Sequence, residues 1–128
     1  MKTRIYLAGG FKGGWHNQVT EELGGNFIFF NPQKHDLNDV DKYTAWDLYH
    51  VEKCDILLGY MSKSNPSGYG LALEIGYAKA MNKLIILVDE RSKFDSEFKR
   101  YFSICQQSSN VSFDSLDDAI NYIKSFVI

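Results

Sequence analysis

The chain has 128 residues, the size of one domain, with a formal net charge of −2 and a pI of about 5.9. This charge balance argues against general binding to nucleic acid or membrane surfaces, and no apolar run approaches the roughly 18 residues of a membrane-spanning helix. The N-terminus lacks a signal-peptide pattern, so we expect a cytoplasmic protein with a single domain at residues 1–128.

Residues 4–8 (RIYLA) form a short apolar run that ends at glycines, which is typical of a buried parallel strand. The loop at residues 9–15 (GGFKGGW) then combines four glycines with one cation and two aromatic side chains. Glycines let a backbone approach a ligand closely, and this position in an α/β sheet often binds nucleotide or phosphate. Although the loop is not the GxGxxG motif, we favour a ligand-binding loop over a merely flexible connection. Its candidate binding residues are Gly9, Gly10, Phe11 and Lys12.

Residues 16–23 are predicted to form a helix that stops at Gly24–Gly25, and residues 26–30 (NFIFF) a second strand. Residues 33–42 are polar and predict a surface loop, long enough to contribute to a pocket wall. The three aspartates of this loop resemble a metal cluster only weakly, so we interpret the segment as a solvated loop.

The next helix is predicted to open at residues 44–47 (TAWD) and to end near Lys53. Thr44 with Asp47 three positions later approximates a capping box, in which side chains pair with backbone N–H groups at a helix start. Alternatively, the Asp47 carboxylate points into a pocket and faces Glu74. The sequence leaves both interpretations open.

Residues 54–60 (CDILLGY) predict a third strand, followed by the stretch from Asn65 to Asn82 (NPSGYGLALEIGYAKAMN). This stretch begins as a turn and continues as a helix that is apolar almost all the way round, which is typical of a buried helix. We expect Asn82 to cap it in a left-handed conformation. Its carboxylate, Glu74, either pairs with its helix start or a buried cation, or has a function, because an unpaired buried charge is very unfavourable. We expect the helix N-terminus to favour its ionised form.

Further along, the pattern predicts a strand at residues 83–88, a helix at 94–104, a short strand at 111–113 and a last helix after an Asp114–Ser115 cap. Strands that alternate with helices predict an α/β fold: one flavodoxin- or Rossmann-like parallel sheet of five strands in the order 2-1-3-4-5, with helices on both faces. The switch point of that sheet lies between strands one and three, where the glycine loop and the Glu74 helix both emerge. This coincidence predicts a site.

Cys54 and Cys105 lie far apart, without a CxxC motif, and we expect reduced thiols. The three histidines are scattered, without metal-ligand spacing, so we expect no metal site.

The predicted site combines two carboxylates with a tyrosine on the first strand (Tyr6), a glycine loop and aromatic faces. These groups suit cleavage at an anomeric carbon, in which one carboxylate attacks C1′ and the other handles the proton of the leaving base. The aromatic side chains would stack on the base. The sequence suggests no Ser–His or Cys–His nucleophile.

The segments IYLAGGF, WDLYHVEKCDILLGYM and NPSGYGLALEIGYAKAMNKLIILV resemble the nucleoside 2-deoxyribosyltransferase superfamily, which includes deoxynucleoside 5′-monophosphate N-glycosidases. The resemblance covers about residues 4 to 88, and its most specific part is the G-x-x-x-E-x-G-Y-A pattern around Glu74. It implies that Glu74 is a nucleophile that forms a covalent ribosyl-enzyme ester and that Tyr6 orients it. It also implies that Asp47 is the acid/base near the departing base, and that Phe11 stacks on that base.

The branch of the superfamily stays open, because a transferase resolves the ester with a second base and a hydrolase with water. Residues 10–14 resemble the phosphate loop of the monophosphate hydrolases, with Lys12 in the place of an arginine and Ser67 as a phosphate-binding serine. Gly10 replaces a serine of that group, and the spacing from Pro66 to Glu74 is one residue longer. Lysine neutralises phosphate but lacks the bidentate fork of arginine. Further candidate substrate contacts are Gly68 and Gly70.

We therefore predict cleavage of the N-glycosidic bond of a (deoxy)nucleoside or its 5′-monophosphate, without a metal or cofactor. Members of this superfamily are usually dimers or larger, so the resemblance implies a homo-oligomer. One alternative is a non-catalytic nucleotide-binding sensor that uses the same pocket. A phosphoribohydrolase of the lysine-decarboxylase-like type is disfavoured, because its Gly-Thr-Glu motif with a neighbouring arginine is absent from the sequence.

Overall fold

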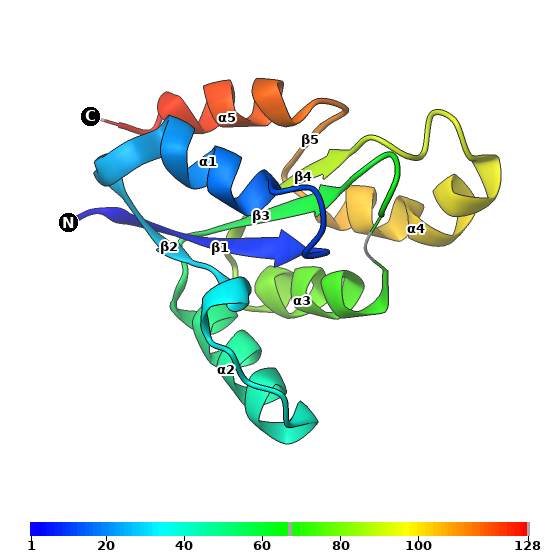
Figure 1. The fold of residues 1–128 in the computed structure, drawn as a ribbon. Coiled ribbons are helices and arrows are strands. Elements are labelled where there is room, and N and C mark those ends of the chain that lie inside the picture. The colour runs from blue at the N-terminus through cyan, green and yellow to red at the C-terminus, as the bar shows by residue number, and fades with distance from the viewer. Residues whose placement is uncertain (67, 128) are drawn as a thin grey trace.

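The computed structural model describes residues 1–66 and 68–127, and in them five parallel strands form one sheet (Figure 1). The strands are β1 (Thr3–Gly9), β2 (Phe27–Phe30), β3 (Ile56–Met61), β4 (Leu84–Asp89) and β5 (Val111–Phe113). Their order is β2-β1-β3-β4-β5, which confirms the predicted α/β class and topology. Because β1 pairs with both β2 and β3, Tyr6 lies opposite Phe30 on one side and Leu57 on the other.

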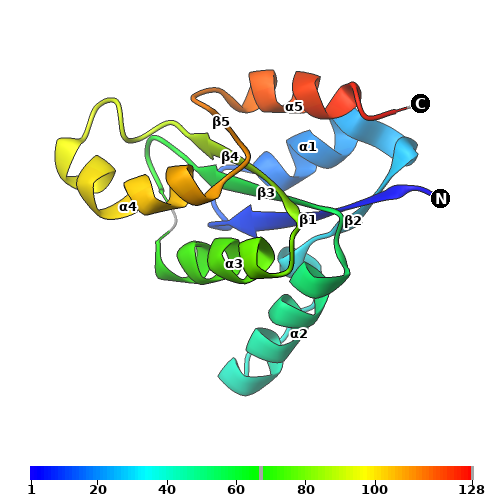
Figure 2. The ribbon, with the colours of Figure 1, turned by 180° about the vertical axis from the view of Figure 1, so that it is seen from behind.

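Helices cover both faces of the sheet, as predicted (Figures 1 and 2). They are α1 (Trp15–Leu23), α2 (Val40–Lys53), α3 (Tyr69–Ala80), α4 (Ser96–Ser108) and α5 (Leu116–Lys124), with short 3-10 helices η1 (Gly24–Asn26) and η2 (Pro32–Lys34). Successive strand residues point to opposite faces. Ile5 and Leu7 therefore pack under α1 and α5, whereas Tyr6 and Ala8 pack under α2, α3 and α4. This alternation directs the Tyr6 hydroxyl toward α3.

The predicted left-handed cap of α3 is confirmed at Asn82, whose φ is 59°. The backbone N–H of Asn82 donates to the carbonyl of Lys79 at 3.1 Å, and that of Lys83 donates to the carbonyl of Ala78 at 2.9 Å. These two bonds form a Schellman motif, which satisfies carbonyls at the helix end and leads the chain directly into β4.

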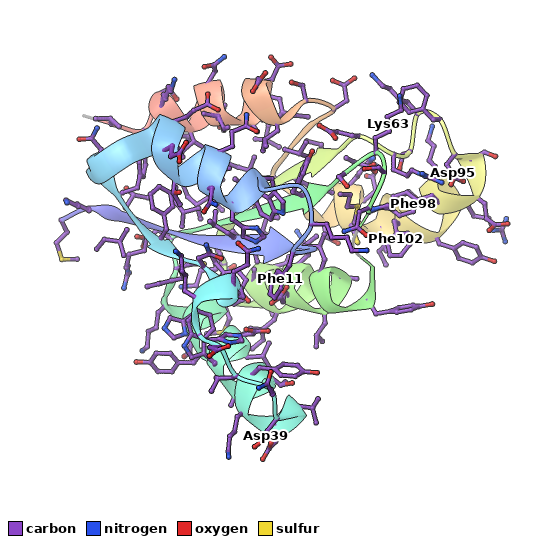
Figure 3. All side chains as sticks on the ribbon, in the orientation of Figure 1. Phe11, Asp39, Lys63, Asp95, Phe98 and Phe102 are labelled. Carbon is purple, nitrogen blue, oxygen red and sulfur yellow. The ribbon has the colours of Figure 1, made fainter. Side chains whose placement is uncertain are left out.

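The start of α2 differs from the prediction. The helix begins at Val40 with Asp39 as its N-cap residue, at the tip that extends beyond the sheet (Figures 1 and 3). Thr44 therefore lies inside the helix, and the capping-box interpretation of Thr44 and Asp47 is wrong. The first turn escaped prediction because it packs against little, with Val40 65% exposed, and so carries no apolar stripe.

Burial of α3 is also less complete than predicted. Leu71, Ile75 and Ala78 are buried against the sheet, whereas Tyr69 is 92% and Leu73 60% exposed. A helix in the outer layer of a three-layer fold keeps one side in solvent, so the apolar character of that side does not reflect burial within this chain.

Candidate active site

A cleft of about 240 Å³ lies at the carboxyl end of β1, between the glycine loop, α2 and α3. Gly9 and Phe11 line it from the loop, Asp47 from α2, and Gly70 and Glu74 from α3. The predicted meeting of the glycine loop and the Glu74 helix at the switch point is confirmed. Ligands of open α/β sheets bind in this crevice because the strand order reverses there and the neighbouring loops part.

Tyr6 connects β1 to the carboxylate of Glu74. Its side chain is fully buried, and its hydroxyl donates a hydrogen bond to Glu74 Oε2 at 2.5 Å. Glu74 lies beyond the first turn of α3, and the described residues of that turn include no acid. Since the helix-dipole effect fades beyond the first turn, the expected stabilisation of Glu74 by the helix N-terminus is wrong. The Tyr6 hydroxyl provides the stabilising contact instead.

The pKa of Glu74 is raised to about 7, chiefly by burial and in smaller part by the nearby charge of Asp47, while the hydrogen bond from Tyr6 opposes the shift. Burial followed by the charge of Glu74 also raises the pKa of Tyr6, so its hydroxyl stays protonated and remains a donor. At neutral pH the Glu74 carboxyl group is therefore close to its titration midpoint. A shift of this size, at a residue that lines a cleft, is typical of functional sites.

Asp47 faces the same cleft from α2, with 24% of its side chain exposed. Burial raises the pKa of Asp47, and the nearby His35 ring and Tyr6 hydroxyl oppose this shift. A raised pKa favours the neutral acid, which can donate a proton. Sequence reasoning missed His35, whose Nε2 lies 3.5 Å from Asp47 Oδ1. Nothing in the polar segment around His35 indicated this contact.

At the start of the glycine loop, Gly9 is needed for close packing against the backbone, whereas Gly10 lies against the end of a side chain that can move. A Cβ at Gly9 would lie 2.7 Å from the carbonyl oxygen of Tyr60, and one at Gly10 would lie 2.8 Å from Asn65 Nδ2. Phe11 projects from this loop and is 52% exposed beside the cleft (Figure 3). The loop thus presents an aromatic face to any occupant of the cleft.

The remaining predicted binding residues are distributed differently. Gly70 lines the cleft, and Gly68 is the N-cap residue of α3. Lys12 lines a separate hollow of about 250 Å³, together with Ser62 and Asn65 from the loop after β3. Ser67 lies outside the described residues.

His16 is a further buried polar group near the glycine loop. Its ring is fully buried, 3.9 Å from the Trp15 ring centroid and 5.7 Å from that of Phe11. Burial lowers the pKa of His16 to about 4, so the ring is neutral at pH 7. In the described part of the chain neither ring nitrogen has a hydrogen-bond partner. His16 therefore acts here as an aromatic support beneath Phe11.

Within residues 1–66 and 68–127, no group of three or more His, Cys, Asp and Glu side chains is arranged to hold a metal ion. No helix in these two ranges combines the length and apolar character needed to cross a membrane. Cys54 and Cys105 are buried free thiols.

Comparisons with known proteins agree with the fold and with the family resemblance. A family model described as nucleoside 2-deoxyribosyltransferase-like matches residues 2–92. Among solved structures, a 2-desoxiribosyltransferase from Leishmania mexicana matches with a TM-score of 0.76 at 20% identity, over 98% of this chain and 99% of the other. A CMP N-glycosidase from Clostridium botulinum matches with a TM-score of 0.63 at 20% identity, over 97% of this chain and 100% of the other. A conserved protein from Enterococcus faecalis V583 matches with a TM-score of 0.73 at 18% identity, over 98% of this chain and 99% of the other. No curated protein gave a significant match.

Proposed function

The chain belongs to the nucleoside 2-deoxyribosyltransferase-like family, and from this premise we propose that it cleaves the N-glycosidic bond of a (deoxy)nucleoside or its 5′-monophosphate. The observation that carries the proposal is the cluster of Glu74, Tyr6 and Asp47. The Glu74 carboxyl group is partly buried, with a pKa of about 7, it is paired with the Tyr6 hydroxyl, and it shares a cleft with a second carboxyl group. Paired carboxyl groups of this kind support glycosidic cleavage.

In the first half of the proposed reaction, ionised Glu74 attacks C1′ of the sugar. The C1′–N bond breaks through an oxocarbenium-like state, and its electron pair leaves with the base. Asp47, as the neutral acid, gives its proton to the departing base. The products are a glutamyl-ribosyl ester, a neutral base and the Asp47 carboxylate. The hydrogen bond from Tyr6 holds Glu74 in one orientation during the attack.

In the second half, an acceptor attacks the ester at C1′. The Asp47 carboxylate removes a proton from that acceptor, and Glu74 leaves as a carboxylate. Water as the acceptor makes the protein a hydrolase, and a second nucleobase makes it a deoxyribosyltransferase. Phe11, half exposed at the cleft, supplies the face on which the base stacks.

Lys12 favours a substrate with a 5′-phosphate. Its side chain belongs to the glycine loop and lines a hollow separate from the cleft, together with Ser62, Asn65, a second lysine (Lys63) and the carboxylate of Glu90. A lysine ammonium group neutralises phosphate as a point charge. We therefore propose that 5′-monophosphates are cleaved faster than nucleosides, and that Lys12→Ala reduces this preference while leaving the cleavage of nucleosides unchanged.

The proposal is tested by incubating the protein with a panel of deoxynucleosides, ribonucleosides and their 5′-monophosphates, each with and without a free second base. Free base without an acceptor identifies a hydrolase, and a new nucleoside that forms only with an acceptor identifies a transferase. Saturable binding without either product would contradict the enzymatic proposal and support the sensor. Trapping of a ribosyl adduct on Glu74, detected by mass spectrometry, tests the covalent step.

We also propose that the protein forms a homo-oligomer. The outer side of α3 presents Tyr69 and Leu73, which are 92% and 60% exposed, and Leu73 also lines the cleft. Met81, the C-cap residue of α3, is 37% exposed. Sedimentation velocity of the wild type and of Leu73→Glu tests this proposal. A wild type that sediments as a monomer at all concentrations would contradict it.

A further inference from the structure

The segment between β2 and α2 brings a second ionisable side chain to Asp47. His35 is the C-cap residue of η2, and its side chain is only 9% exposed. The His35 ring packs edge-on against Trp46, with 4.8 Å between centroids and 70° between planes. Asp36 follows with a φ of 54°, and this left-handed turn returns the backbone N–H of Leu37 to His35 Nδ1 at 3.0 Å. The ring is thus held from two directions.

The bond from Leu37 determines which nitrogen of His35 carries the proton. A ring nitrogen that accepts a hydrogen bond has no proton of its own, so the proton of the neutral imidazole is on Nε2. Nε2 is also the atom that faces Asp47 Oδ1, at 3.5 Å. His35 therefore presents an N–H, rather than a lone pair, to the carboxyl group.

Asp47 Oδ1 requires a hydrogen-bond donor such as this N–H. It is buried, and in the described ranges no group forms a hydrogen bond with it. The other groups that act on Asp47 are already engaged: the Tyr6 hydroxyl donates to Glu74, and His50 Nδ1 pairs with the Trp46 carbonyl at 2.8 Å. At 3.5 Å the His35 contact is longer than the about 2.7–3.2 Å of a formed bond. Catalytic hydrogen bonds are often long without substrate and shorten in the substrate complex.

We infer that His35 positions Asp47 and determines which of its oxygens carries the acidic proton. An N–H at Oδ1 requires that oxygen to be an acceptor, so the proton of the neutral carboxyl group must be on Oδ2. Because Oδ1 is buried while the side chain is 24% exposed, Oδ2 is the oxygen that can reach the cleft. His35 thereby directs the proton toward the leaving base. This inference rests on the proposed role of Asp47, and His35 itself touches no substrate.

Three substitutions separate the functions of the His35 ring. His35→Asn keeps an acceptor for the Leu37 N–H but has no donor that reaches Asp47. His35→Gln places an amide N–H near the position of Nε2. His35→Phe keeps the packing on Trp46 and loses both polar contacts.

We expect kcat to fall about 10-fold to 100-fold in the Asn and Phe variants, less than the roughly 10²–10⁴-fold that a complete general acid contributes. The Gln variant should recover most of this loss. In the background of Asp47→Asn, His35→Asn should have no further effect.

A substrate that needs no acid provides the decisive control. An N7-methylated purine deoxynucleoside carries a positive charge on its base, which leaves without taking up a proton. We expect His35→Asn to slow cleavage of the unmethylated deoxynucleoside and to leave the methylated one at the wild-type rate. A merely structural role of His35 would slow both substrates equally.

The tautomer provides a readout that does not require activity. In protein with ¹⁵N-labelled histidine, long-range ¹H–¹⁵N correlations should show His35 protonated on Nε2, with its signals identified by their loss in His35→Asn. Protonation on Nδ1 overturns the inference. If the wild type releases base from no member of the substrate panel described above, the proposed function fails and the inference with it. If the wild type cleaves both and His35→Asn slows them equally or not at all, only the inference fails.

Discussion

Glu74 and Asp89 are two acidic side chains at the carboxyl edge of the same sheet, and their surroundings differ. Asp89 ends β4 and is 5% exposed. Its Oδ1 accepts from the backbone N–H groups of Arg91 and Ser92, each at 2.9 Å. Its Oδ2 accepts from Ser92 Oγ and from Gln106 Nε2. In the described part of the chain, Glu74 accepts a hydrogen bond from Tyr6 and from no other donor.

The difference separates structural acids from reactive ones. The donors around Asp89 occupy both of its oxygens and connect the loop after β4 to α4, so this carboxylate has no free lone pair directed at a substrate. Glu74 has been removed from water without an equal number of protein donors, and its pKa has risen to about 7. Both acids line open spaces, Glu74 the cleft of about 240 Å³ and Asp89 a hollow of about 450 Å³, so the donors around each carboxylate are what distinguishes them. The carboxylate with an incomplete set of donors is the one that can form a bond with a ligand.

The largest expected effect is on catalysis. Glu74→Gln should lower the rate of base release by about 10⁴-fold or more, because it removes the nucleophile from a group of residues that act as a unit. Asp89→Asn should leave kcat/KM within a few-fold of the wild type at temperatures where the variant is folded. Single-turnover measurements of base release compare the two. Equal losses of base release in both variants would show that the different surroundings of Glu74 and Asp89 do not determine which acid is catalytic.

The same two substitutions should affect stability in the opposite way: Glu74→Gln should stabilise the fold and Asp89→Asn should destabilise it. The folded-state pKa of Glu74 is raised above 4.5, so the folded protein holds a proton that the unfolded chain has lost, and stability falls as the pH rises from about 4.5 to 7. Glu74→Gln removes this term and should raise the free energy of unfolding at pH 8 by roughly 1 to 3 kcal/mol, at about 1.4 kcal/mol per pKa unit. Asp89→Asn should lower it by about 2 to 4 kcal/mol, because donors lose a charged acceptor. Urea unfolding at pH 8 and at pH 4 measures both; a loss of stability in Glu74→Gln would contradict this reasoning.

The pH dependence of activity should change when Tyr6, the hydrogen-bond partner of Glu74, loses its hydroxyl. Because the nucleophile must be ionised, kcat/KM should fall as the pH drops below about 7. The hydrogen bond from Tyr6 lowers the pKa of Glu74, so Tyr6→Phe should move this acidic limb to higher pH and reduce kcat about 10-fold. The limb reports the coupled pair of Glu74 and Asp47 rather than one residue. An unchanged limb in Tyr6→Phe would show that the hydroxyl does not act through Glu74.

The smallest expected effect concerns substrate binding. Phe11 beside the cleft and Phe94 beyond β4 are similarly exposed, at 52% and 61%. Phe11→Ala should raise KM about 10-fold with little change in kcat, since the stacking of one base on an aromatic ring contributes about 1–3 kcal/mol. Phe94→Ala is the matched control and should leave KM unchanged. A loss of kcat rather than of binding would show that Phe11 shapes the cleft instead of stacking on the base.

Much of this arrangement was predictable because it depends on local patterns. Apolar runs bounded by glycine indicated the strands, and the alternation of strands with helices indicated their order. Glu74 was noticeable because it is the acid of an otherwise apolar helix. The left-handed cap at Asn82 followed from the preference of asparagine for that conformation.

Asp47 shows where prediction from the sequence stops. Thr44 and Asp47 have the spacing of a capping box, and only the helix start at Val40 excludes that interpretation. The expected help of the helix N-terminus to Glu74 was wrong for a related reason, because α3 begins at Tyr69 and its first turn ends before Glu74. Helix ends depend on contacts made elsewhere in the fold, so spacing alone cannot locate them.

The amino-acid order was sufficient for the topology of the sheet and for the residues that could react, because hydrophobic periodicity and turn chemistry act between near neighbours. The folded structure decided how those residues are coupled: it contains the bond from Tyr6 to Glu74 that the family resemblance implied, and it adds the contact of His35 with Asp47. These pairs join side chains from different elements, and their burial, which sets the pKa values, is a property of the assembled layers. No short stretch of the chain contains that information.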